Sequence, residues 1–148
     1  MTTDRPSLQI ACPHCATINR VAAERLQDSP LCGQCKRWLF IGAPTPLTAA
    51  TFAAHAERSD LPLLIDFWAG WCHPCRTMAP QFEAATATLE PAVRLAKIDT
   101  EAESALASRF DIRSIPTMLL LHRGREIARQ SGVMQASQIV AWTRSKLG

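Results

Sequence analysis

Residues 63–80 of the chain, LLIDFWAGWCHPCRTMAP, carry the pattern that decides the fold. The segment 63–68 is apolar apart from Asp66, which predicts a strand that is buried on both faces. After Ala-Gly, the two cysteines of the CHPC sequence at 72–75 open a segment whose apolar residues recur at helical spacing. A strand therefore leads into a helix N-terminus at these thiols. Backbone N–H groups and the helix dipole lower a thiol pKa there and favour the nucleophilic thiolate.

The spacing of Cys72 and Cys75 adds a second step to this chemistry. Cys75, one turn along the helix, can attack a mixed disulfide formed at Cys72 and close a small ring. We therefore favour a redox-active dithiol over a structural disulfide or half of a metal site. Asp66 must be buried in the preceding strand, which is costly without a reason, so we favour a role for it in proton transfer.

The first 42 residues contain the other four of the six cysteines, as Cys12-x2-Cys15 and Cys32-x2-Cys35. This spacing is typical of a structural zinc ribbon, in which four thiolates fill a tetrahedral site around one Zn²⁺ and leave no open position. A segment this short cannot bury enough apolar surface alone, so metal binding would supply its folding free energy. Two disulfides or a second redox centre are the alternatives.

Residues 12–15, CPHC, also spell the dithiol sequence of a strongly oxidising periplasmic family. We expect no buried strand before them and no helix after them, and a matched cysteine pair follows at 32–35. These residues are therefore interpreted as a zinc knuckle.

The composition excludes several classes of function. With 16 Lys and Arg against 13 Asp and Glu, scattered rather than striped, the chain shows no nucleic-acid footprint. Its longest apolar runs fall far short of the roughly 20 residues of a membrane span. The N-terminus lacks the apolar region of a secretory signal. Six cysteines without an export signal indicate a reducing compartment, so we expect a cytoplasmic protein.

Beyond the cysteine-rich segment, the apolar periodicity predicts an α/β domain. Two prolines within 43–48 indicate a linker. Because strands and helices alternate after it, we expect a central mixed sheet flanked by helices on both faces. The expected elements are helices at 49–58, 74–89, 101–110 and 136–147, and strands at 63–68, 93–99, 118–122 and 126–131.

Together with Ile115-Pro116-Thr117, these features make residues 49–148 resemble thioredoxin over their whole length. The four-cysteine module at 1–42 narrows the resemblance to the bacterial zinc-ribbon thioredoxins of the thioredoxin 2 type. It implies a thioredoxin fold at 49–148, joined by the linker at 43–48 to the zinc-ribbon module. The residues that carry the resemblance are Asp66, Phe67, Trp68, Ala69, Trp71, Cys72, Pro74, Cys75, Pro80, Lys97, Asp99, Pro116, Thr117, Gly124 and Gly132.

The resemblance implies a role for each residue of the site. Cys72 would be the exposed nucleophile and Cys75 the buried resolving thiol. Asp66 would take the proton from Cys75, with Lys97 tuning the pKa of Asp66. A cis proline, Pro116, would present the backbone before it to an extended substrate strand. The substrate-docking surface would comprise Trp71, His73, Pro74, Ile115, Pro116, Gly132 and Val133.

The implied activity is that of a thiol-disulfide oxidoreductase, which reduces oxidised protein substrates and is recharged by an NADPH-dependent thioredoxin reductase. One structural Zn²⁺ and no bound organic cofactor are expected, in a monomer without a nucleic-acid or membrane partner. Two alternatives stay open. One is a binding module whose zinc ribbon recruits nucleic acid or a protein on a passive thioredoxin platform. The other is a zinc-dependent redox sensor, in which oxidation of the four module cysteines ejects the metal.

Three features depart from the family pattern. His73 replaces the usual glycine between the cysteines. A cationic histidine there would stabilise the Cys72 thiolate, so we expect a more oxidising potential than that of an ordinary thioredoxin. Ser114 stands where glycine commonly precedes the Ile-Pro pair. Pro44 and Pro46 fall where the family's first edge strand would lie, so we expect that strand to be short or missing.

Two smaller expectations concern residues outside these motifs. The apolar run at 38–41 is expected to form a ribbon strand or a seam against the second domain. The remaining histidines are expected at the surface or in turns, namely His14, His55 and His122.

Overall fold

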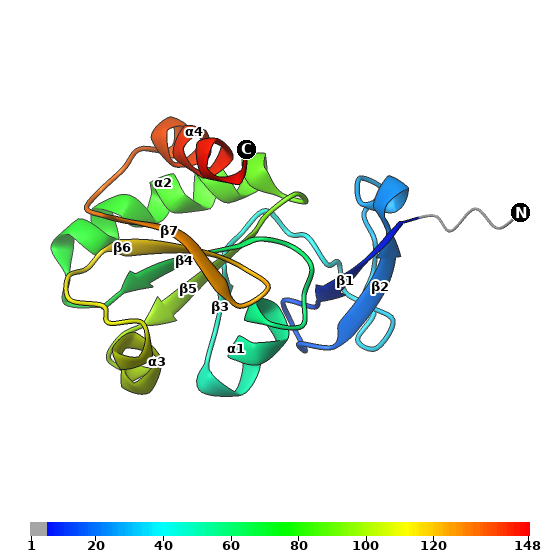
Figure 1. Ribbon diagram of the computed structural model, residues 1–148, viewed down its shortest axis with the longest axis horizontal. Helices are drawn as coiled ribbons and strands as arrows, with labels where there is room; N and C mark the ends of the chain where they lie inside the picture. Colours follow the sequence, from blue (N-terminus) through cyan, green and yellow to red (C-terminus); the bar gives the residue numbers. More distant parts are fainter. Residues whose placement is uncertain (1–5) are drawn as a thin grey trace, which may run out of the picture.

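The computed structural model describes residues 6–148, in which a small two-stranded module packs against a larger domain (Figure 1). Residues 1–5 of the predicted zinc-ribbon module lie outside the described residues. Within the described range, no helix is both long enough and apolar enough to cross a membrane.

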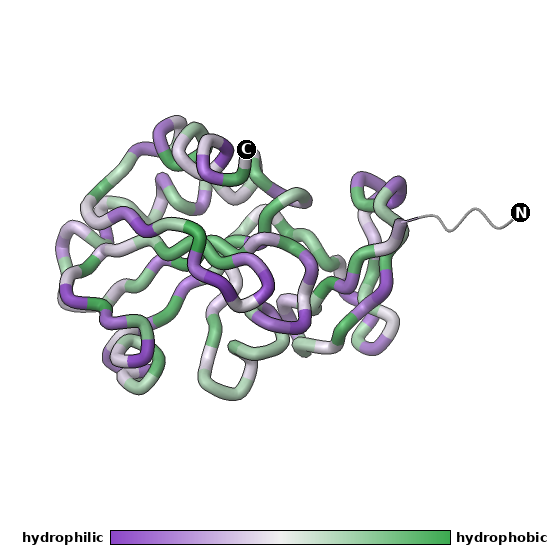
Figure 2. Tube along the Cα trace, in the orientation of Figure 1, coloured by the Kyte–Doolittle hydropathy of each residue, from purple (hydrophilic) through white to green (hydrophobic). Residues whose placement is uncertain are grey.

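A five-stranded mixed sheet forms the centre of the larger domain, in the order β3-β5-β4-β6-β7. The central strand β4, Leu63–Trp68, pairs in parallel with β5, Arg94–Asp99, and antiparallel with β6, Thr117–His122. β6 turns back into the antiparallel edge strand β7, Arg125–Ser131. Figure 2 shows hydrophobic residues along the strands at the centre of the domain. These strands are apolar on both faces because helices cover both sides of the sheet.

Two helices lie on each face of the sheet (Figure 1). α1, Ala49–Ala56, and α3, Ser104–Arg109, cover one face. α2, His73–Leu89, and α4, Ala136–Leu147, cover the other. The predicted α/β fold, a mixed sheet with helices on both faces, is confirmed.

Alternation along β4 supplies both hydrophobic cores. Ile65 and Phe67 belong to the core under α1 and α3, whereas Leu64 belongs to the core under α2 and α4. Asp66 lies on the same side of the strand as Leu64, so its carboxyl group is turned toward α2.

The stretch 43–48, predicted as a linker, contains the two-residue edge strand β3, Thr45–Pro46. β3 pairs in parallel with Ala96 and Lys97 of β5. The expectation of a short first strand is confirmed, because Pro46 has no N–H with which to extend the ladder. The boundaries of the module, the linker and the domain stay predictions.

The small module is built on an antiparallel hairpin that the sequence pattern did not predict. Its strands are β1, Ser7–Ala11, and β2, Ile18–Ala22, and a short 3-10 turn, Ala23–Arg25, follows them. β1 ends directly before the CPHC sequence, and its last two residues are fully buried. The expectation that no buried strand precedes CPHC is therefore wrong.

The module packs against the end of the sheet at which β4 begins. The Asp60 N–H donates to the Gln9 carbonyl at 2.7 Å, and the Gln9 N–H donates to the Asp60 carboxylate at 2.7 Å. Leu61 completes the module's own hydrophobic core, which contains Ile10 and Leu39. The module thus buries apolar surface of the larger domain along with its own.

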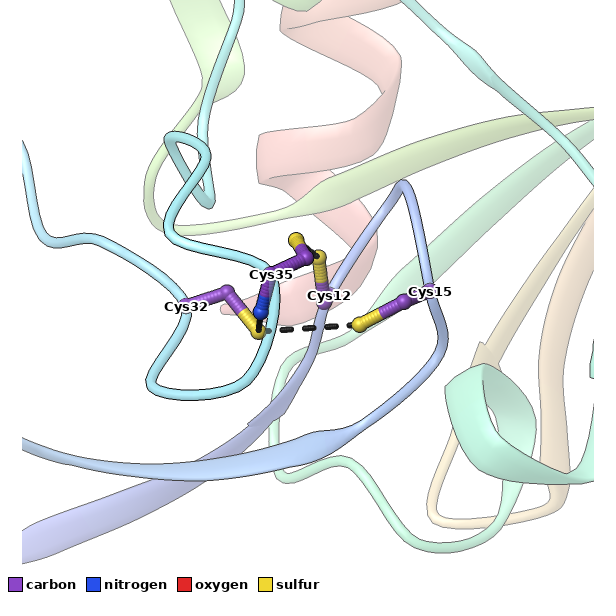
Figure 3. A group of neighbouring side chains, drawn as sticks. All are labelled: Cys12, Cys15, Cys32 and Cys35. Carbon is purple, nitrogen blue, oxygen red and sulfur yellow. Dashed lines mark hydrogen bonds between the residues drawn. The ribbon is translucent and has the colours of Figure 1, made fainter.

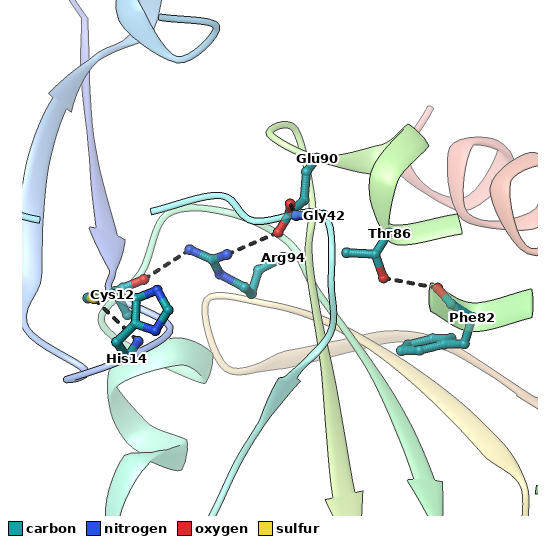
Figure 4. Close-up of polar contacts among 8 residues, drawn as sticks. Cys12, His14, Gly42, Phe82, Thr86, Glu90 and Arg94 are labelled. Atoms are coloured by element: carbon teal, nitrogen blue, oxygen red, sulfur yellow. Dashed lines mark hydrogen bonds and ion pairs between the residues drawn. The ribbon is translucent and has the colours of Figure 1, made fainter. Parts of the chain in front are cut away.

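Arg94, the first residue of β5, joins the two units although only 2 % of it is exposed (Figure 4). One of its guanidinium nitrogens lies 3.1 Å from a Glu90 carboxylate oxygen, and the other donates to the Ala11 carbonyl at 3.1 Å. The guanidinium carbon lies 4.9 Å from the centre of the Phe40 ring. Glu90 also accepts a bond from the Gly42 N–H at 2.8 Å. These contacts connect the module to the end of α2 and the start of β5.

The expectation that His55 lies at the surface or in a turn is wrong. It belongs to α1, which contacts β1 of the module, and it is only 2 % exposed. Burial and the nearby charge of Arg94 lower the pKa of His55 to about 4, so its ring is neutral at pH 7. The sequence around His55, a single histidine in an alanine-rich helix, does not indicate that the module covers this position.

The module and the CHPC sequence lie at opposite ends of the sheet (Figure 1). β4 starts beside the module and ends at the two cysteines. α2 then returns along the sheet, from these cysteines to Glu90 at the module.

Candidate functional site

Cys72 and Cys75 lie where β4 gives way to α2, as the sequence predicts. Cys72 is the N-cap residue of α2, and its sulfur accepts a hydrogen bond from the Cys75 N–H at 3.2 Å. The two sulfurs are at disulfide-bonding distance, with Cα atoms 5.3 Å apart. Pro74 stands in the first turn of α2, where no intrahelical bond requires its missing N–H. The helix N-terminus therefore stabilises negative charge on the Cys72 sulfur.

The two cysteines differ less in exposure than expected. Cys72 was expected to be exposed, but it is 4 % exposed, against 2 % for Cys75. Ala69 is buried with them, and Trp68 and Ile115 pack against this cluster. Since so little of Cys72 is open, the segments that flank it decide what can approach its sulfur.

Asp66 is fully buried, and neither of its carboxylate oxygens has a hydrogen-bond partner among residues 6–148. Burial raises the pKa of Asp66 to about 7, and the charge of Lys97 opposes this rise. Lys97 stands opposite Asp66 in the register of β4 and β5, with its ammonium nitrogen 4.7 Å from the centre of the Trp68 indole. A carboxyl group with a pKa near 7 can both accept and release a proton at neutral pH.

The Ile115–Pro116 peptide bond is cis, as the resemblance implied. The Ile115 carbonyl oxygen lies 3.8 Å from the Cys72 sulfur. The Pro116 carbonyl accepts a bond from the Gly132 N–H at 2.9 Å. Residues 115–116 and residue 132 therefore lie together beside the dithiol.

Ser114, which departs from the family pattern, connects this loop to the end of β7. Its hydroxyl donates to the Ser131 hydroxyl at 3.4 Å, and its carbonyl accepts a bond from the Thr117 hydroxyl at 2.6 Å. A glycine at position 114 would lack the first of these bonds.

Trp71 is 67 % exposed beside the dithiol, and its indole N–H donates to a Glu101 carboxylate oxygen at 2.7 Å. His73 and Pro74 at the start of α2 are also exposed, as is Val133 on the neighbouring loop. The docking role of these residues stays a prediction. Glu101 was missed, because an acid in a polar segment looks the same in sequence whether it is solvated or bonded to a distant indole.

The other four cysteines form one cluster in the module (Figure 3). Their sulfurs all lie within 4.8 Å of one another. Close approaches cross between the two pairs, from Cys12 to Cys35 and from Cys15 to Cys32, each at 3.6 Å. The cluster thus joins the two turns that carry the pairs.

This geometry fits a tetrahedral zinc site. A Zn–S distance of ~2.3 Å places neighbouring sulfurs about 3.8 Å apart, close to the cross-pair distances observed. The N–H groups of His14 and Gln34 donate to Cys12 and Cys32 at 3.3 and 3.4 Å, which suits sulfurs that carry negative charge. Within the described residues, the group of possible metal ligands here consists of the four thiols without the His14 imidazole.

Comparison with protein families gives two matches. The family described as Thioredoxin matches residues 43–145, and the family described as Thioredoxin 2, N-terminal matches residues 11–37. The chain belongs to the thioredoxin family. Its N-terminal module is accordingly of the zinc-ribbon type found in thioredoxin 2.

Individual thioredoxins support the same conclusion. Thioredoxin C-3 of Corynebacterium nephridii is 44 % identical over 138 residues, which cover 93 % of this chain and 94 % of the relative. The thioredoxin of Rickettsia bellii is 34 % identical over 101 residues, 68 % of this chain and 96 % of the relative. Thioredoxin Y, chloroplastic, of Oryza sativa is 30 % identical over 132 residues, 89 % of this chain and 73 % of the relative.

Family membership and geometry together define the chemistry in outline. The protein has a thioredoxin fold and is a thiol-disulfide oxidoreductase with Cys72 and Cys75 at disulfide-bonding distance. The zinc-ribbon match and the four clustered cysteines indicate a zinc site in the module. Thioredoxins in general act on protein substrates and have a reductase as a partner.

Proposed function

We propose that this thioredoxin is a protein-disulfide reductase in which Cys72 is the nucleophile and Cys75 the resolving thiol. The observation that carries the proposal is the Cys72 sulfur at the N-cap of α2, where it accepts the Cys75 N–H at 3.2 Å. A sulfur in this position is stabilised as a thiolate, whereas the Cys75 sulfur lies one turn inside the helix.

The reaction transfers two electrons through sulfur alone. The Cys72 thiolate attacks one sulfur of the substrate disulfide, so a mixed disulfide forms and one substrate thiolate leaves. The Cys75 thiolate then attacks the Cys72 sulfur, which breaks the mixed disulfide and releases the second substrate thiolate. The Cys72–Cys75 disulfide is formed, and the substrate is left as a dithiol once each thiolate has taken up a proton.

Asp66 is proposed to accept the proton that Cys75 must lose before this second attack. Its carboxylate is turned toward α2, it lacks a hydrogen-bond partner among the described residues, and its pKa is raised to about 7. Proton transfer through a water molecule would match both the buried position and the neutral-pH chemistry. Lys97 is proposed to keep the pKa of Asp66 from rising further.

Substrate docking is proposed to use the exposed residues around Cys72 and the backbone of Ile115. The Ile115 carbonyl lies 3.8 Å from the Cys72 sulfur and can accept a hydrogen bond from an extended substrate segment. Trp71 supplies the largest exposed apolar side chain beside the site. The complete proposed docking surface is Trp71, His73, Pro74, Ile115, Pro116, Gly132 and Val133, of which Pro116 is buried and Ile115 half-buried.

The zinc ion is proposed to be structural, held by Cys12, Cys15, Cys32 and Cys35. When bound, it supplies four metal–thiolate bonds that hold the two turns of the module together and leave no open position. No organic cofactor takes part in the proposed reaction. We further propose a cytoplasmic monomer that an NADPH-dependent thioredoxin reductase returns to the dithiol form.

An insulin-reduction assay with two sources of electrons tests this function. Wild type, Cys72→Ser and Cys75→Ser are compared with NADPH and thioredoxin reductase, and separately with dithiothreitol. Activity of the wild type in both assays is expected, with none in Cys72→Ser and a trapped mixed disulfide in Cys75→Ser. Failure of the wild type with both reductants would reject the proposed activity, whereas failure with the reductase alone would reject only that partner.

The redox-sensor alternative predicts that zinc loss and activity change together. Peroxide titration with parallel measurements of released zinc and insulin reduction separates the two ideas. Zinc release without a change in insulin reduction would rule out the sensor. The opposite positions of the zinc cluster and the dithiol at the two ends of the sheet favour that outcome (Figure 1).

A further inference from the structure

The zinc module has an exposed apolar face that neither its fold nor its metal site uses. Leu31 is 53 % exposed, Trp38 60 % and Ile41 45 %, and they are half of the large hydrophobic residues that are exposed in residues 6–148. Leu31 and Trp38 are joined by an antiparallel bridge, so their side chains stand beside each other. Polar residues at these positions would leave the bridge intact and avoid exposing apolar surface to water.

The surrounding residues show that this exposure is specific to one side of the segment. Leu39, next to Trp38, is fully buried in the module core, and Phe40 lies beneath the Arg94 guanidinium. The run 38–41 was predicted to form either a ribbon strand or a seam against the second domain. Leu39 therefore packs in the module core, and Phe40 packs where the module meets the larger domain. Trp38 and Ile41 are left facing outward.

The apolar residues border a groove of about 490 Å³ that cationic side chains also line. The groove is lined by Leu31, Trp38 and Ile41 together with His14, Lys36 and Arg37. We call these six residues the Trp38 face. No carboxylate lines the groove among the described residues. The groove therefore combines apolar surface with positive charge.

A second hollow, of about 240 Å³, shares Leu31 with the groove and is also lined by cations. Arg20 and Arg25 line it, opposed by Asp28. Across residues 6–42, four Lys and Arg stand against two acids, a surplus of two positive charges that offsets the two net negative charges of four thiolates around one Zn²⁺.

We propose that the Trp38 face docks a segment of a partner protein that carries large apolar residues among acidic ones. The apolar residues would fill the groove against Leu31, Trp38 and Ile41, and the carboxylates would pair with Lys36 and Arg37. Nucleic acid fits less well, because a phosphate backbone needs a track of cations and here half of the lining residues are apolar.

The position of the Trp38 face allows a docked partner to reach the dithiol at the same time. The module lies at the end of the sheet opposite the dithiol, so a partner held there leaves the Cys72 surface free (Figure 1). A protein that engages both sites binds its second site intramolecularly, which raises the effective concentration of its disulfide at Cys72. The docking itself does not depend on which redox step the dithiol performs.

Peptide display on the zinc-loaded full-length protein tests the proposal. A random-peptide library is selected at low salt against wild type, with counter-selection against the Leu31→Ser/Trp38→Ser variant. Enriched peptides are expected to combine acids with large apolar residues. Synthesised copies should lose about tenfold or more in affinity with Trp38→Ser, should lose affinity with Lys36→Glu/Arg37→Glu, and should bind more weakly as salt rises.

Ile127→Ser is the matched control, since Ile127 is a comparably exposed apolar residue on β7, outside the module. Its affinity for the peptides is expected to equal that of the wild type. Zinc content and circular dichroism establish that every variant is folded. The proposal is overturned if no selected peptide depends on Trp38, if the dependent peptides are basic, or if an oligothymidylate probe binds the face and displaces them.

Discussion

The two CxxC sequences at 72–75 and 12–15 have the same spacing but form different structures. One opens a helix, and the other contributes to a cluster of four cysteines. Each one follows a strand whose last residues are well packed, β4 in one case and β1 in the other. After Cys75 the chain continues as the long helix α2, whereas after Cys15 it turns back into the antiparallel strand β2. The two sites therefore differ in the element that follows the cysteines, a helix in one and a strand in the other, and not in the strand that precedes them.

The following element decides which sulfur each cysteine meets. At the start of α2, Cys72 accepts the Cys75 N–H and the two sulfurs of that pair meet each other. In the module, the short distances run across pairs, as between Cys12 and Cys35. Pairing within one CxxC gives a reversible dithiol, while pairing across two gives a cage for a metal.

The largest expected effect comes from reciprocal serine substitutions in the two sites. Cys72→Ser is expected to lower insulin reduction by more than about a thousandfold, because the nucleophile is removed, while zinc stays bound. Cys12→Ser is expected to lose zinc and lower Tm, because three thiolates hold the ion less tightly, while the Cys72–Cys75 disulfide still forms. Zinc analysis, thermal unfolding and thiol titration of both variants measure these effects. Loss of zinc from Cys72→Ser would show that the sites are not separate.

The next effect concerns the buried acid of the dithiol site. Asp66 has a folded-state pKa of about 7, above its ordinary value of 3.8, so between these pH values the folded state holds a proton that the unfolded state releases. Stability should therefore fall as pH rises from about 4 to about 7. Asp66→Asn removes this dependence and should be more stable than wild type by about 4 kcal/mol at pH 8, with almost no gain at pH 4.

Urea unfolding of the oxidised protein at the two pH values measures the change. Asp28→Asn, which alters an exposed acid of the module, is the control and should show neither effect. An equal gain for Asp66→Asn at both pH values would mean that packing, rather than burial of charge, explains it.

A somewhat smaller effect is expected at the seam beside the zinc site. Arg94→Ala should lower the free energy of unfolding by about 3 kcal/mol, because it leaves the Glu90 carboxylate buried without its ion pair. Arg113→Ala is the control, since Arg113 forms an exposed pair with Asp111, and pairs of this kind contribute about 1 kcal/mol or less. Denaturant unfolding compares them. Similar losses in the two variants would contradict the role of Arg94 in joining the units.

The smallest expected effect is on the redox potential of the dithiol. If His73 stabilises the Cys72 thiolate, His73→Gly should make the potential more negative by about 30 mV. His73→Arg, which places a permanent cation at the helix N-terminus, should not make the potential more negative than that of wild type. Equilibration with a glutathione buffer gives both values. A constant or less negative potential in His73→Gly would remove the explanation offered for this departure from the family pattern.

Local patterns in the sequence were sufficient for the parts of the fold that depend on neighbours along the chain. The strand before Cys72, the helix after it and the short first strand imposed by Pro46 follow from periodicity, N-terminal chemistry and the missing proline N–H. The α/β class followed from the alternation of elements. The cysteine spacing likewise predicted the four-thiol cluster, since two tight turns with this separation can aim four sulfurs at one point.

The tertiary structure decided everything that depends on the module meeting the domain. Arg94 and His55 look like ordinary strand and helix residues in sequence, yet both are buried because the module covers them. Trp38 and Leu39 are both large hydrophobic residues, and only the path of the folded chain turns one outward and the other into the core. The sequence by itself determined which thiols lie at a helix N-terminus and which four cluster in the module, because helix N-termini and cysteine turns are local. Burial of single side chains is set by contacts between segments far apart in the chain, so only the fold could assign it.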